Sequence, residues 1–212
     1  MEGIFKKLAF MAVTGSLAPS TIANDADNTN AFEGKKVVIV YYSHSGETYN
    51  SSGNIYLEKG NTEVVAEKIQ KHIEGSKIVK LDVKEKYPTG YEKMIEYVKK
   101  QQEKGVLPEL EKSPDVSEFD IIFVGTPVWW GKMSLPVESF LKSEACKGKI
   151  IIPFITHEGS GESGIGASME DLSGCEKVLK SLVIKGSKAN TETTDETIKT
   201  FLDNIELKVF DS

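Results

Sequence analysis

Residues 37–46 read Val-Val-Ile-Val-Tyr-Tyr-Ser-His-Ser-Gly, a continuous apolar run that ends in hydroxyl residues and a glycine. An apolar run of this length is typical of a strand buried on both faces of a sheet. Residues 121–124, 150–155 and 178–184 have the same character, whereas the short alternating segment 78–81 is typical of an edge strand. The sequence therefore predicts five strands.

A helical pattern follows each predicted strand, with apolar residues three and four positions apart. These segments are residues 62–73, 91–105, 136–141, 165–172 and 198–205. Alternation of strands and helices predicts an α/β fold, a three-layer sandwich whose five-stranded parallel sheet carries helices on both faces. The two strongest apolar runs, the first and the third, should be central, which gives the strand order 2-1-3-4-5. Ligands of such sheets bind beyond the carboxyl ends of the strands.

The first of the loops at that edge, residues 43–48, reads Ser-His-Ser-Gly-Glu-Thr. Small hydroxyl residues and a glycine after a buried strand can curl the backbone into a concavity of N–H groups that binds a phosphate. The loop contains no lysine, so a phosphate would be held rather than transferred. The alternative is an ordinary turn. The candidate contacts are Ser43, His44, Ser45, Gly46, Glu47 and Thr48.

An insert, residues 49–59, separates this loop from the helix expected to face the phosphate. Asn61 or Thr62 would cap that helix. The insert is either a hairpin or lid over the ligand, or a surface loop.

The second loop reads Thr126-Pro-Val-Trp-Trp-Gly131 and carries both tryptophans of the chain. Two adjacent residues of a loop cannot both pack into one core direction. An indole at a ligand crevice is well suited to stack on a flat heterocycle, whereas the alternative is a hydrophobic plug over the sheet edge.

The third loop follows the fourth strand and contains Gly-Ser-Gly-Glu-Ser-Gly at residues 159–164, a literal dinucleotide-binding pattern. That pattern belongs after the first strand, and the next strand here ends without an acidic residue for a ribose. We therefore expect a flexible loop whose backbone amides lie close to a planar ligand.

Together the three loops resemble those of bacterial flavodoxins, in which Ser-x-Ser-Gly, Pro-x-Trp-Trp-Gly and Thr-His-x-Gly-Ser-Gly recur. The resemblance covers residues 36–205 and implies non-covalent FMN. It implies that the phosphate lies in the first loop, which Asn61 and Thr62 complete, and that the ring lies between the second and third loops. The insert leaves open whether Glu47 and Thr48, or Asn61 and Thr62, make the last phosphate contacts. Cofactor contacts expected beyond the first loop are Asn61, Thr62, Thr126, Pro127, Val128, Trp129, Trp130, Gly131, His157, Glu158, Gly159 and Gly161.

The resemblance implies an electron-transfer flavoprotein that works with a redox partner protein or a small electron acceptor. The alternatives are a small FMN-dependent NAD(P)H or quinone reductase and a non-enzymatic binding module. Of the 26 basic residues all are lysine, and the formal net charge is −6. These features argue against nucleic acid as a partner. Two cysteines and three scattered histidines argue against a metal site.

Residues 1–34 differ from the domain expected over 35–212. Lys6 and Lys7 precede a short apolar stretch and then a polar run, which predicts an export signal cleaved after Ala23 and a disordered linker. The protein would then be periplasmic or secreted, and otherwise cytoplasmic. The apolar stretch is too short to be an integral membrane segment.

The two cysteines, Cys146 and Cys175, each precede a strand on neighbouring positions of the predicted sheet. They are either a disulfide or two separate thiols.

Overall fold

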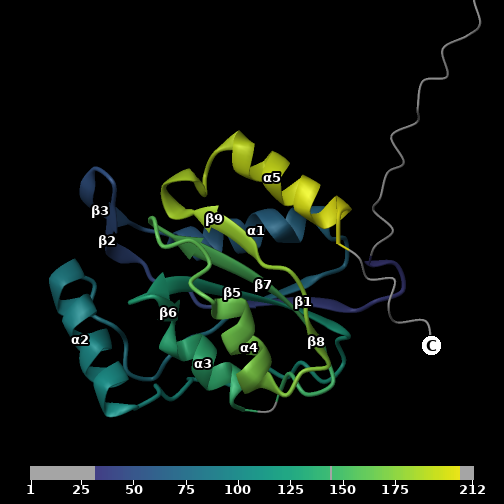
Figure 1. Ribbon diagram of the computed structural model, residues 1–212, viewed down its shortest axis with the longest axis horizontal. Coiled ribbons are helices and arrows are strands. Elements are labelled where there is room, and N and C mark those ends of the chain that lie inside the picture. The colour runs from purple at the N-terminus through teal and green to yellow at the C-terminus, as the bar shows by residue number, and fades with distance from the viewer. Residues whose placement is uncertain (1–31, 144, 206–212) are drawn as a thin grey trace, which may run out of the picture.

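The computed structural model describes residues 32–143 and 145–205 (Figure 1). The predicted export signal, cleaved after Ala23, lies outside this part of the chain, as does the linker predicted up to residue 34 except for its last three residues. The strands are β1 (Val37–Tyr41), β2 (Gly46–Asn50), β3 (Gly53–Leu57), β4 (Lys77–Lys80), β5 (Ile121–Trp129), β6 (Lys132–Met133), β7 (Ile150–His157), β8 (Lys177–Val178) and β9 (Leu182–Lys185). The helices are α1 (Asn61–His72), α2 (Tyr91–Lys104), α3 (Leu135–Leu141), α4 (Ile165–Ser173), the short 3₁₀ helix η2 (Gly186–Lys188) and α5 (Glu192–Asp203).

The main sheet is parallel in the order β4-β1-β5-β7, and both β8 and β9 pair with β7 beyond it. This is the predicted order 2-1-3-4-5 with one correction, because the fifth strand is divided. Residues 179–181 separate β8 from β9. In register, Tyr41 lies opposite Gly125, and Gly125 lies opposite Phe154, so the central strands end at one common edge.

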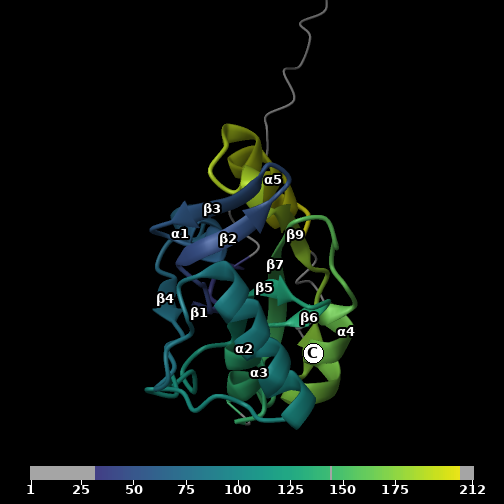
Figure 2. The same ribbon diagram turned by 90° about the vertical axis from the view of Figure 1, so that its left-hand side faces the viewer.

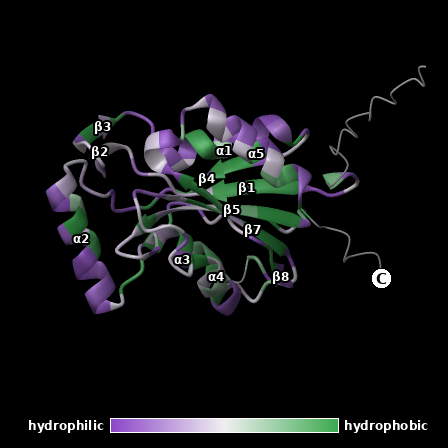
Figure 3. Ribbon diagram, turned by 45° about the horizontal axis from the view of Figure 1, so that its top comes forward, coloured by the Kyte–Doolittle hydropathy of each residue, from purple (hydrophilic) through white to green (hydrophobic). Residues whose placement is uncertain are grey.

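Helices cover both faces of the sheet, as expected for three layers. Figure 1 shows α1 and α5 on one face and α3 and α4 on the other. Successive residues of β1 alternate between two apolar clusters: Val37 and Ile39 pack with the α1 and α5 side, and Val38 and Val40 with the α3 and α4 side. Figure 3 shows the resulting apolar centre of the sheet. Burial on both faces explains why the strand sequence does not alternate.

The insert is a hairpin, in which β2 and β3 pair antiparallel. It lies beyond the carboxyl edge of the sheet together with α2, which stands apart from the two helical layers (Figures 1 and 2). The hairpin and α2 therefore extend the molecule on the side where the predicted ligand loops emerge.

The third predicted strand is longer than expected. It was predicted to end at residue 124, but β5 continues to Trp129 and turns back into β6, with Trp129 paired to Lys132. Trp130 and Gly131 form the turn with φ of 51° and 72°. Positive φ at both central residues gives the turn that matches the right-handed twist of a hairpin. Gly131 adopts it freely, whereas Trp130 is strained.

Candidate cofactor site

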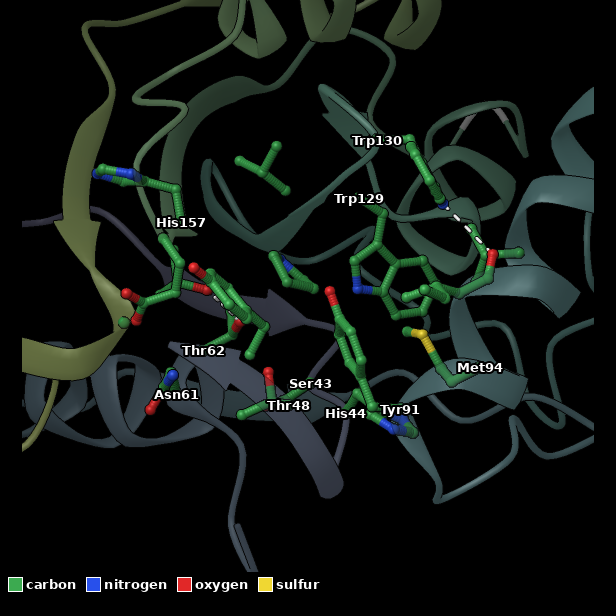
Figure 4. A pocket seen from close by; sticks show the side chains of 18 of the residues that line it. Ser43, His44, Thr48, Asn61, Thr62, Tyr91, Met94, Trp129, Trp130 and His157 are labelled. Carbon is green, nitrogen blue, oxygen red and sulfur yellow. Dashed lines mark hydrogen bonds between the residues drawn. The ribbon is translucent and has the colours of Figure 1, made fainter. Parts of the chain in front are cut away.

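A cavity of about 370 Å³ opens at the carboxyl edge of the sheet (Figure 4). Its walls come from the loops after β1, β5 and β7, from the hairpin, and from α2. Predicted residues that line it are Ser43, His44, Glu47, Thr48, Asn61, Thr62, Pro127, Val128, Trp129, Trp130, Gly131, His157 and Glu158. Three loops far apart in sequence therefore meet in one place.

One end of the cavity is polar and lies at the beginning of α1. The Ser43 hydroxyl is buried and accepts the backbone N–H of Glu63 at 3.1 Å. The Thr62 and Thr156 hydroxyl oxygens lie 2.7 Å apart. The first N–H groups of a helix have no acceptor within the helix, and those of Asn61 and Thr62 have none in the described part of the chain. This end combines free amides, hydroxyls and the positive end of a helix dipole.

The hairpin divides the first loop into two segments that remain in contact. A Cβ on Gly60 would lie 2.2 Å from the His44 carbonyl oxygen and 2.3 Å from Ser43 Oγ. Gly60 is also the N-cap of α1, without a side-chain cap, so the prediction of Asn61 or Thr62 as N-cap is wrong. The capping oxygen comes instead from Ser43 across the insert.

Glu47 is hydrogen-bonded to residues at the start of α2. Its backbone N–H donates to the Thr89 carbonyl at 2.7 Å, and its Oε2 accepts the N–H of Tyr91 at 2.9 Å. Asn61 and Thr62 lie at the polar end of the cavity, and Thr48 also lines the cavity, so the choice between the two pairs stays open.

The other end of the cavity is apolar and centres on Trp129. The Trp129 ring meets those of Tyr42 and Tyr87 edge to face, with centroids 5.3 and 5.0 Å away. Trp130 is 57% exposed, and its Nε1–H donates to the Ile95 carbonyl at 3.3 Å. The two tryptophans therefore point in different directions, as the sequence predicted (Figure 4).

The third loop is held by its own histidine. His157 Nδ1 accepts the N–H groups of Gly159 and Gly161 at 2.9 and 3.1 Å. These two bonds give the loop a defined turn, and its flexibility stays a prediction. Glu158 Oε1 accepts the N–H of Ser187, whereas its Oε2 is buried without a partner among the described residues.

Five predicted residues do not line the cavity: Ser45, Gly46, Thr126, Gly159 and Gly161. Two of them have clear structural roles. The Thr126 hydroxyl accepts the N–H of Ser134 at 2.9 Å beneath the second loop. A Cβ on Gly46 would lie 2.6 Å from the Thr89 carbonyl oxygen, so this position requires glycine.

Helix α2 supplies the wall that the sequence did not predict. Tyr91, Met94, Ile95 and Val98 line the cavity, and the Tyr91 side chain lies beside Trp129 (Figure 4). Their helical spacing was visible, but the same stripe is typical of a helix packed on a core. Further lining residues outside the prediction are Tyr49, Leu57, Thr156, Ser160 and Gly186.

Charge at the cavity is limited. Among the described residues, none of those that line it is a lysine. Burial, and then the positive charge of Lys80, lower the pKa of His44, whose Nε2 is buried without a partner in the described part of the chain. Within residues 32–143 and 145–205 there is no cluster of side chains that could hold a metal ion, and no helix is long and apolar enough to span a membrane.

The donor set fits the cofactor that the loops predicted. Free amides and a hydroxyl at a helix N-terminus suit a phosphate, and an indole within an apolar wall suits a flat heterocycle.

Comparison with solved structures places the fold among flavoproteins. A protein from Bacteroides eggerthii is 17% identical with a TM-score of 0.60, covering 80% of this chain and 96% of its own. One from Bacteroides uniformis is 19% identical with a TM-score of 0.59, covering 80% and 99%. A flavoprotein from Lactobacillus acidophilus, solved in complex with FMN, is 23% identical with a TM-score of 0.55, covering 74% and 97%.

Among curated proteins, none matches this chain. The family model described as flavodoxin matches residues 36–205, which is nearly all of the described chain. This match supports FMN as the cofactor. The chain belongs to the flavodoxin family.

Proposed function

We propose that this protein binds FMN non-covalently in the cavity and transfers electrons between other molecules. The observation that carries the proposal is the division of one cavity into a polar end at α1 and an apolar end at Trp129. FMN has the same division, with a phosphate at one end and a flat ring at the other.

The polar end would hold the phosphate. The N–H groups of Asn61 and Thr62 and the hydroxyls of Ser43 and Thr62 are the donors available there. Hydrogen bonds to a charged group are stronger than those between neutral groups, so amides and hydroxyls can hold a phosphate without a lysine.

The apolar end would hold the ring. Trp129 offers an aromatic surface, and Met94 and Val98 of α2 are buried in the same cluster. Bound FMN supplies the redox chemistry, and the protein sets its orientation, its access to water and its potential.

One observation favours a second candidate, an FMN-dependent reductase of small molecules such as quinones. The Trp130 indole N–H donates to the Ile95 carbonyl, so α2 lies against the second loop. A helix is about 10 Å across with its side chains. A protein partner that docked on this helix would be kept at that distance, whereas a small acceptor could enter the cavity.

Anaerobic reductive titration of the FMN-loaded protein tests the proposal. A yellow protein that takes up electrons reversibly, and passes them to an added acceptor, would support it. Saturable oxidation of NADH with a quinone would favour the reductase. A purified protein that neither carries nor binds FMN would leave only a non-redox binding module.

A further inference from the structure

The hairpin, residues 46–57, forms part of the cavity wall. It interrupts the phosphate loop, yet Gly60 still touches Ser43 and His44, so the two halves of the loop close up beneath it. The interruption therefore leaves the polar end intact. The hairpin therefore contributes to the cavity at another place, where β2 meets α2.

The contact between β2 and α2 is made chiefly by Glu47. Helix α2 has Gly90 as its N-cap and no side-chain cap of its own. Glu47 Oε2 accepts the N–H of Tyr91, the first residue of the helix, at 2.9 Å. The Glu47 backbone N–H also holds the Thr89 carbonyl at 2.7 Å. A carboxylate at this place both satisfies a free N–H and complements the helix dipole.

Helix α2 needs this support because it stands off the sheet (Figure 1). Only Met94 and Val98 are buried in it. Two hydrogen bonds join it to the second loop, one from Trp130 Nε1 to the Ile95 carbonyl at 3.3 Å and one from Gln102 Nε2 to the Trp129 carbonyl at 3.5 Å. Both hydrogen bonds are long. The Tyr97 ring also meets Tyr87 edge to face, with centroids 5.6 Å apart.

The side chains that Glu47 places are those of the cavity wall. Tyr91 is the residue whose N–H Glu47 accepts, and the next turn carries Met94 and Ile95. The Tyr91 ring is also packed against Tyr49 of the hairpin, with centroids 6.4 Å apart and an interplanar angle of 31°. The start of α2 is thus fixed to the hairpin by one carboxylate and one aromatic contact.

We propose that Glu47 is a positioning residue for the cofactor: it caps α2 from the inserted hairpin and so holds the wall that covers the flavin ring. This rests on the proposed function, since the ligand is FMN. It assigns to Glu47 a role at the ring end of the cavity, whereas its place in the phosphate-loop motif suggested the other end.

A binding experiment with the full-length apoprotein and three flavins distinguishes effects at the two ends of the cavity. FMN has phosphate, ribityl chain and ring, riboflavin lacks the phosphate, and lumiflavin has the ring alone. Fluorescence-quenching titrations would compare wild type with Glu47→Ala and Glu47→Gln. Glu58→Ala is the matched control, because Glu58 is exposed beside the same hairpin and makes no described contact with α2.

Glu47→Ala is expected to weaken all three flavins by the same factor, about fivefold, which corresponds to the loss of one helix cap. Glu47→Gln keeps an acceptor oxygen and should recover part of the loss. Glu58→Ala should bind as wild type does. Hydrogen exchange of the segment around Tyr91 in the apoprotein should be faster in Glu47→Ala than in Glu58→Ala, with little difference in melting temperature.

The proposal is overturned if Glu47→Ala binds all three flavins as wild type does, or if it weakens FMN alone, which would place Glu47 at the phosphate. Unchanged hydrogen exchange around Tyr91 would also overturn it. Failure of wild type to bind any flavin would refute the proposed function instead, and the exchange measurement would still decide whether Glu47 holds α2.

Discussion

Ser43 and Ser45 lie two residues apart in one motif, but the structure gives them different surroundings. Ser43 is buried at the start of α1, whereas Ser45 is exposed and does not line the cavity. We predict that Ser43→Ala weakens FMN by about 1–2 kcal/mol, the range for one hydrogen bond to a charged group, and riboflavin much less. Ser45→Ala should change neither affinity measurably. Fluorescence titration of both variants checks this, and a larger effect of Ser45→Ala would reverse the assignment.

Trp129 and Trp130 should also differ in their effect on bound flavin. Trp129 stands in the apolar wall, so Trp129→Ala should cost at least about 1 kcal/mol of FMN affinity and leave bound flavin more fluorescent. Trp130→Phe replaces the indole by a smaller ring without the N–H bonded to Ile95, and should leave the quenching of flavin fluorescence unchanged. Time-resolved fluorescence of the bound flavin measures the difference. Stronger quenching by Trp130 than by Trp129 would show that the ring lies on the other indole.

The lowered pKa of His44 predicts that the free energy of unfolding of the apoprotein depends on pH. Burial and Lys80 lower its pKa in the folded protein, so the folded state disfavours the protonated imidazole. The stability of the apoprotein is then complete above the ordinary histidine pKa of about 6.5 and declines as the pH falls below it, towards the lowered folded value. Chemical denaturation at pH 7 and pH 5 should show a smaller loss for His44→Gln than for wild type. Equal losses would mean that His44 does not titrate in this range.

At this scale the sequence predicted the ligand loops but not the direction of every side chain. Trp129 was predictable because residues at the ends of buried parallel strands meet at the carboxyl edge, and Thr62 was predictable from the resemblance to flavodoxins. Ser45 and Thr126 share the same motifs, yet membership of a motif does not say which way a residue points. Tyr91 and Met94 were missed because a helical apolar stripe is equally typical of core packing.

Elements were predicted best where burial alone determines them. The apolar runs of β1, β5 and β7 and the stripe of α1 gave the parallel sheet and its order. The ends of elements depend on other forces. β5 continues to Trp129 because β6 folds back and pairs with it, and α1 begins at Asn61 because only glycine fits against His44 at the preceding position.

The hairpin and α2 depend on contacts between distant segments, which a local pattern does not contain. Strands β2 and β3 are mostly exposed, and a two-stranded hairpin alone is marginally stable. Its tie to α2 through Glu47 is therefore part of what supports it. For the insert, residues 49–59, the sequence left open a hairpin or lid and a surface loop.

The two cysteines lie at the edge of the sheet opposite the cavity. Their loops are adjacent, with the Gly148 N–H bonded to the Gly174 carbonyl at 3.4 Å, and both side chains are free thiols. Burial, and then Cys175, raise the pKa of Cys146 to about 12. Since the thiolate is the reactive form, iodoacetamide at pH 8 should modify Cys175 first in the native protein. After denaturation without reductant, mass spectrometry should find both alkylated, and an unmodified pair would reveal a disulfide.

We expect one cavity to bind the whole FMN molecule, with the phosphate at α1 and the ring at Trp129. Titration of the apoprotein with FMN and with riboflavin tests it most directly. We expect one FMN per chain, and at least about tenfold weaker binding of riboflavin, because riboflavin lacks the group that the N–H groups of Asn61 and Thr62 would hold. Equal affinity for the two flavins, or no binding of either, would contradict the account.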